Sequence, residues 1–122
     1  VTAVRSQAAR VSVPKFNLNS NELASTFIGE FVGVFVLVSA FLVTKGEPLY
    51  MGFVLVALVM MVGALSGSHL NPLISVGAWV TRRLSHLKTA VYLIAQFLGA
   101  GAAFVLMTTY LNGVQADAAA LA

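Results

Sequence analysis

Long apolar stretches separated by short polar segments dominate the chain. Residues 23–44 contain a single charged residue, Glu30, and residues 89–116 contain none. A helix that crosses a bilayer needs about 20 predominantly apolar residues. The pattern therefore predicts one membrane span at about residues 22–44 and another at about residues 89–111.

The apolar stretch between them, residues 48–81, is too long for one span and too short for two. Small and polar residues interrupt it, which predicts a span at about residues 49–65, a loop, and a half-helix at residues 72–80. Asn71 is a good N-cap residue, and Pro72 suits the first helical position, where no backbone N–H is needed. We therefore expect a re-entrant loop, which is tolerated in a membrane only where protein or a water-filled cavity surrounds it.

The expected fold class is an all-α integral membrane protein with three transmembrane helices plus a re-entrant loop and a half-helix. Composition agrees, because 59% of residues are hydrophobic and only 9% are charged, whereas a soluble domain carries about a quarter charged residues. A water-soluble globule and a disordered chain are excluded. The absence of cysteine excludes a disulfide scaffold.

No pattern of catalytic chemistry is present. The sequence offers no nucleophile with a base, no paired carboxylates, no metal-ligand cluster and no phosphate loop. We therefore predict neither enzyme activity nor a metal site. No basic face remains outside the spans, so nucleic-acid binding is not expected.

The basic residues are distributed unevenly across the predicted membrane. The opposite side of the bilayer has only Lys45, whereas six basic residues share one side: Arg5, Arg10, Lys15, Arg82, Arg83 and Lys88. The positive-inside rule places the N-terminus inside and the C-terminus outside.

Three regions follow from this pattern: a basic extended arm at residues 1–20, a membrane unit at residues 21–112 and a C-terminal tail at residues 113–122. The arm is rich in Arg and Ser and lacks acidic residues. Two interpretations remain open, a trimmed chain start or the remnant of an organellar transit sequence.

The run Ser66-Gly-Ser-His-Leu-Asn-Pro-Leu-Ile-Ser75 resembles the first re-entrant loop of the aquaporin and glycerol-facilitator family, which usually reads SGxHxNPAVT. Glu30-Phe-Val-Gly-Val-Phe-Val is similar to the family's first helix, and Tyr92-Leu-Ile-Ala-Gln-Phe-Leu-Gly-Ala100 is similar to its third. The resemblance covers residues 22–111 and implies the first half of an inverted-repeat fold. Leu73 and Met51 depart from it, because the family has alanine and an aromatic residue at these positions.

The resemblance implies roles for six residues. Asn71, followed by Pro72 and Leu73, would cap the half-helix, line a pore, or do both. His69 would pin the loop by hydrogen bonds; an ionisable function and an axial bond to a pigment metal are the alternatives. Glu30 would accept backbone N–H groups of the loop and Gln96 would help to orient it, because a carboxylate in the membrane needs partners.

Small residues recur four positions apart in each span, which lets helices approach closely. The residues predicted to pack helices are Gly29, Gly33, Gly63, Gly67, Ala95 and Gly99.

Two functional hypotheses follow. In the first, the chain is a structural subunit of a larger complex in a thylakoid or mitochondrial inner membrane, with its N-terminus on the stromal or matrix side. Its partners would be membrane lipid and other membrane subunits, with lipid or pigment bound. In the second, it is a half-channel for water or small neutral solutes, completed by a second half-repeat. An antiparallel homodimer is disfavoured, because the charge bias opposes insertion in both directions.

Overall fold

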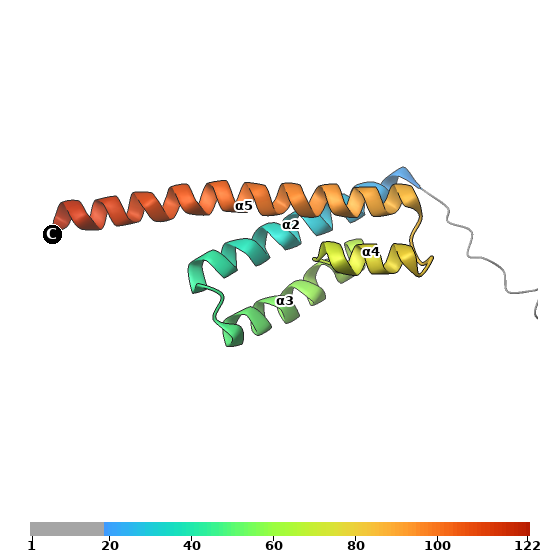
Figure 1. Ribbon diagram of the computed structural model, residues 1–122, viewed down its shortest axis with the longest axis horizontal. Coiled ribbons are helices and arrows are strands. Elements are labelled where there is room, and N and C mark those ends of the chain that lie inside the picture. Colours follow the sequence, from blue (N-terminus) through green and yellow to red (C-terminus); the bar gives the residue numbers. More distant parts are fainter. Residues whose placement is uncertain (1–18) are drawn as a thin grey trace, which may run out of the picture.

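The computed structural model describes residues 19–122. The described chain folds into four helices, α2 (Ser20–Thr44), α3 (Pro48–Ser66), α4 (Pro72–Val80) and α5 (His86–Leu121), without strands (Figure 1). Within this part of the chain, α2, α3 and α5 are long and apolar enough to cross a membrane, and α4 is a short helix of 9 residues. The all-α membrane fold with a half-helix is confirmed.

The helices are arranged around α2, which packs against both α3 and α5. The short helix α4 packs on α5. It begins part-way along the bundle and runs toward the end where α5 begins (Figure 1). The chain between α3 and α4 therefore turns back part-way along the bundle.

Local sequence signals define the ends of these helices. Asn19 caps α2, Asn71 caps α4 and Ser85 caps α5, each accepting a hydrogen bond from a backbone N–H of the first turn. Pro48 and Pro72 open α3 and α4, at positions where the missing N–H costs nothing.

Glycines allow α2 to pack closely against its neighbours. A Cβ atom on Gly29 would lie 3.0 Å from Cβ of Ser66, and one on Gly99 would lie 2.5 Å from the carbonyl oxygen of Phe31. A Cβ on Gly33 would collide with the side chain of Leu70. The backbones of α2 and α5 thus meet more tightly than side chains would permit.

The last helix is longer than the sequence pattern predicts. We expected a span ending near residue 111 and a separate tail at residues 113–122, but α5 continues to Leu121. The final segment contains no proline and is rich in alanine, the residue with the highest helix propensity. The predicted arm at residues 1–20 lies almost entirely outside the described residues.

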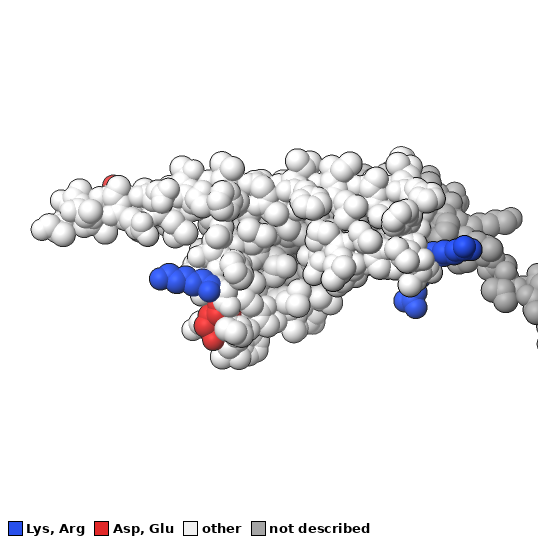
Figure 2. Space-filling model, viewed as in Figure 1, with Lys and Arg blue, Asp and Glu red and all other residues white. Residues whose placement is uncertain are grey.

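The surface of the bundle is apolar and its charges lie near the ends. Figure 2 shows Lys and Arg near the α2–α3 turn and near the α4–α5 turn, with an uncharged belt between them. Large apolar side chains remain exposed on α3 and α4, including Phe53, Met60 and Leu73. Such a surface suits lipid or a further membrane segment.

Candidate functional site

The re-entrant loop, residues 67–71, connects α3 to α4 in an unusual backbone conformation. Gly67 ends α3 with φ of 86°, and Ser68 and Leu70 also have positive φ, at 54° and 51°. Non-glycine residues in this region cost on the order of 1 kcal/mol each or more. The loop therefore requires contacts that hold it in place.

The carboxylate of Glu30 provides those contacts. Oε1 accepts hydrogen bonds from the hydroxyl of Ser66 (2.6 Å) and the backbone N–H of His69 (3.0 Å). Oε2 accepts from the backbone N–H of Leu70 (2.7 Å) and from Nε2 of Gln96 (2.9 Å). Glu30 is completely buried, and a carboxylate is tolerated there only because its oxygens are paired. One side chain of α2 thus fixes the loop and joins it to α5.

A second set of bonds fixes the half-helix. Nε2 of Gln96 also donates to the hydroxyl of Ser75 (3.0 Å), and Nδ1 of His69 lies 3.0 Å from the same oxygen. Ser75 is fully buried on α4. The loop, α4 and α5 therefore share one continuous hydrogen-bond network that runs from Glu30 to His69.

Tyr92 closes the network on the side of α5. Its hydroxyl donates to the backbone carbonyl of Ser66, and its ring stacks on that of His69 with the centroids 4.2 Å apart. The imidazole of His69 is thus held between Ser75 and Tyr92. These contacts favour the loop-pinning role that the resemblance implies for His69, and that role stays a prediction.

Asn71 and Leu73 lie at the tip of the half-helix, where α4 begins. Oδ1 of Asn71 accepts from the backbone N–H of Leu73 (2.9 Å), directly after Pro72. Asn71 is exposed, and within the described residues its Nδ2 amide has no hydrogen-bond partner. Leu73 is 76% exposed. The tip therefore presents an amide donor and an apolar side chain outward.

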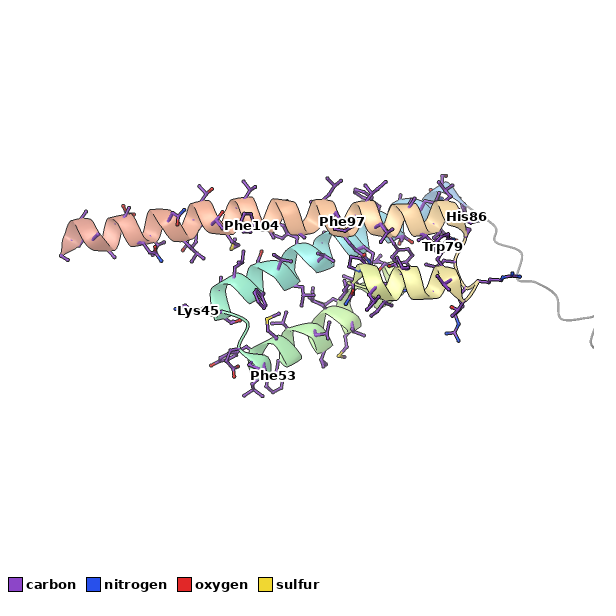
Figure 3. All side chains as sticks on the ribbon, in the orientation of Figure 1. Lys45, Phe53, Trp79, His86, Phe97 and Phe104 are labelled. Atoms are coloured by element: carbon purple, nitrogen blue, oxygen red, sulfur yellow. The ribbon has the colours of Figure 1, made fainter. Side chains whose placement is uncertain are left out.

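A hollow of about 570 Å³ lies beside the half-helix, between the loop and the basic end of the bundle. His69, Ile74, Gly77, Thr81 and Arg83 are among the residues that line it. In the turn at its far end, Nε1 of Trp79 donates a hydrogen bond to Nδ1 of His86 (3.0 Å). Figure 3 labels both side chains where α4 leads into α5. The hollow thus extends along α4 from His69 in the loop to Arg83 in the α4–α5 turn.

The small residues predicted to pack helices have different surroundings. Ala95 is fully buried on α5. A Cβ on Gly63 would lie 3.2 Å from the hydroxyl of Ser68, and Gly67 supplies the left-handed end of α3. This pair therefore serves the loop, whereas Gly29, Gly33 and Gly99 serve contacts between elements.

Sequence comparison shows which family the chain belongs to. A sequence model of the family described as major intrinsic protein matches residues 17–122. The chain belongs to the major intrinsic protein family.

Individual relatives agree with this assignment. Aquaporin Z of Brucella melitensis is 33% identical over 103 residues, which cover 76% of this chain and 45% of that protein. Aquaporin-B of Dictyostelium discoideum is 34% identical over 104 residues, 79% of this chain and 35% of that protein. Aquaporin FA-CHIP of Pelophylax lessonae is 39% identical over 54 residues, 44% of this chain and 20% of that protein. This major intrinsic protein therefore spans less than half the length of these relatives, and no solved structure matches it.

Ser75 and Tyr92 are site residues that the sequence pattern does not mark. Each lies four positions from a residue that was singled out, Ser75 from Asn71 and Tyr92 from Gln96. Residues four apart share one face of a helix. That spacing was the signal available in the sequence.

Proposed function

We propose that this chain forms one half of a membrane pore for water or small neutral solutes, completed by a second, inverted half. The exposed amide of Asn71, at the tip of a half-helix that the Glu30 network holds against α5, carries the proposal. The inverted half can belong to the same polypeptide or to another one.

The half-helix provides selectivity against cations. Its N-terminal end carries a partial positive charge of about half an elementary charge from the aligned peptide dipoles. A cation at the tip meets that charge with little water to screen it, whereas a neutral solute does not. Arg83, which lines the hollow toward the interface, adds a positive charge on the approach.

The loop provides hydrogen-bond acceptors that can replace the water shell of a solute. The N–H groups of His69 and Leu70 are bonded to Glu30. In a trans peptide the carbonyl points opposite to the N–H, so the carbonyls of Ser68 and His69 point away from Glu30. Together with the amide donor of Asn71, these acceptors would form a short polar path for a solute.

A second half is required because the tip is uncovered. Asn71 and Leu73 are exposed where α4 begins, part-way along helices that are long and apolar enough to span a membrane. Irregular backbone and polar groups within a membrane need protein or a water-filled cavity around them. A second half with its own half-helix would supply both.

The half-channel replaces the structural-subunit hypothesis as the better-supported function. The relatives named above are aquaporins from a bacterium, an amoeba and a frog, and none points to a host complex, a pigment or an organelle. Family membership also supports a non-enzymatic role for the chain.

The proposal is tested by osmotic shrinkage of liposomes, measured by stopped-flow light scattering. One set of liposomes holds the chain alone, and another holds the chain with the part of Brucella Aquaporin Z that lies beyond the matched region. We expect water flux above that of empty liposomes only in the second set. Flux equal to that of empty liposomes in both sets would overturn the proposal, and flux through the chain alone would show that copies of it complete one another.

A further inference from the structure

A second hollow, of about 580 Å³, lies where α2 and α5 begin and α3 ends. It is separate from the tip of the half-helix and from the hollow beside it. Its lining includes Glu22, Ser25, Thr26, Ser66, Lys88 and Tyr92. We infer that this hollow binds the headgroup of a zwitterionic aminophospholipid. Lys88 pairs with the phosphate of the headgroup, and Glu22 accepts hydrogen bonds from its primary ammonium.

The position of the hollow suits a lipid headgroup. Its lining extends along α2 from Asn21 to Thr26, about 8 Å at 1.5 Å per residue. It lies at the basic end of the bundle, the end that also carries Arg82 and Arg83. The interfacial layer of a bilayer is about 5–8 Å thick on each side. The hollow therefore opens at the level of phosphates and glycerol groups.

The two charges at this hollow select a zwitterion. Glu22 and Lys88 come from different helices and both line it, and within residues 19–122 no ion pair joins them. A phosphate pairs with an ammonium group, and a primary ammonium donates hydrogen bonds to a carboxylate. A phosphatidylglycerol headgroup would meet the carboxylate of Glu22 with no cation to offer. A choline headgroup has no N–H to donate to it.

The floor of the hollow is polar and its side is apolar. The hydroxyl of Ser25 donates to the carbonyl of Leu65 (2.8 Å), and that of Tyr92 donates to the carbonyl of Ser66. Both hydroxyl oxygens keep lone pairs that can accept from an ammonium group. Leu65 is 48% exposed beside them and offers contact to the first part of an acyl chain. These features favour a lipid over a free phosphate compound.

The test is native mass spectrometry of the full chain released from nanodiscs that contain equimolar phosphatidylethanolamine, phosphatidylcholine and phosphatidylglycerol. We expect phosphatidylethanolamine to be retained preferentially. Lys88→Gln and Glu22→Gln should each lower that retention about tenfold, since each removes one charge-assisted hydrogen bond. Glu22→Gln should also raise the share of phosphatidylglycerol.

The matched control variants are Lys45→Gln and Glu47→Gln, which remove an opposite pair of charges at the other end of the bundle and should leave lipid retention unchanged. Equal retention of the three lipids would overturn the inference. So would unchanged selectivity in both Lys88→Gln and Glu22→Gln. Soluble phosphoethanolamine that competes as well as the lipid would show a free phosphate compound to be the ligand and would overturn the assignment to lipid.

Discussion

The side chain of Gln96 on α5 donates a hydrogen bond to the carboxylate of Glu30 on α2, across 66 positions of sequence and over 2.9 Å. The same carboxylate holds two backbone N–H groups of the re-entrant loop. The position of the loop therefore depends on a contact between the first and last helices of the described chain. Changes in that contact should affect the whole unit.

Replacing Glu30 by glutamine should destabilise the fold. An amide has one acceptor oxygen in place of two, so at least one of the four donors around Glu30 loses its partner inside the bundle. Each buried donor left unpaired costs about 1–3 kcal/mol, and we expect a loss of about 3 kcal/mol. Reversible unfolding in mixed micelles measures it. Asp117→Asn, an exposed change at the end of α5, is the control, and equal stability of the two variants would contradict the network.

Replacing Tyr92 by phenylalanine should have a smaller effect of the same sign. The change keeps the ring that stacks on His69 but leaves the carbonyl of Ser66 without its donor. We expect a loss of about 1–2 kcal/mol. The matched variant Tyr110→Phe changes a side chain that is 62% exposed, and it should alter the unfolding free energy by less than about 0.5 kcal/mol. Identical unfolding midpoints would argue against a role for the hydroxyl.

Two glycines of α5, only two positions apart, should respond to alanine in opposite directions. A Cβ at Gly99 would lie 2.5 Å from the carbonyl oxygen of Phe31, whereas one at Gly101 meets nothing within 4 Å. Gly99→Ala must push α2 and α5 apart and should cost about 2 kcal/mol. Gly101→Ala should gain up to about 1 kcal/mol from helix propensity. Thermal unfolding of both variants in the same detergent measures these changes. A Gly99→Ala variant as stable as the unaltered chain would mean that α2 and α5 are not in close contact.

The helix ends were predictable from sequence where the signal is local. Asn71 and Pro72 mark the start of α4 by their own chemistry, so the predicted half-helix 72–80 coincides with the observed one. The end of α5 was not predictable from hydropathy, because helix formation continues beyond a segment of membrane-spanning length when an alanine-rich segment follows.

The candidate site was predictable only in part, because several of its residues become important only through contacts in the tertiary structure. Glu30 is conspicuous because it is a charge within an apolar span. Ser75 and Tyr92 are ordinary residues in a membrane helix, and their importance arises from which side chains the tertiary structure brings beside them. The pairing of both carboxylate oxygens of Glu30 likewise depends on α2, the loop and α5 together.

The proposed pore makes its sharpest prediction at Asn71, because the two functions of this side chain can be separated. Asn71→Asp keeps the oxygen that accepts from the N–H of Leu73, and a negative charge at a helix N-terminus stabilises the helix. It removes the amide donor, however, and places a carboxylate where the half-helix otherwise repels cations.

In liposomes that hold the chain with an inverted half, Asn71→Asp should therefore leave the unfolding midpoint nearly unchanged, lower water flux and allow cations to leak. Asn71→Ala separates the effects further, since it loses the cap as well and should cost about 1 kcal/mol of stability. Water flux and cation exclusion equal to those of the unaltered chain in Asn71→Asp would mean that the tip does not line the conducting path. Because that variant retains the cap, a change in flux at constant stability can come only from the missing donor and the added charge.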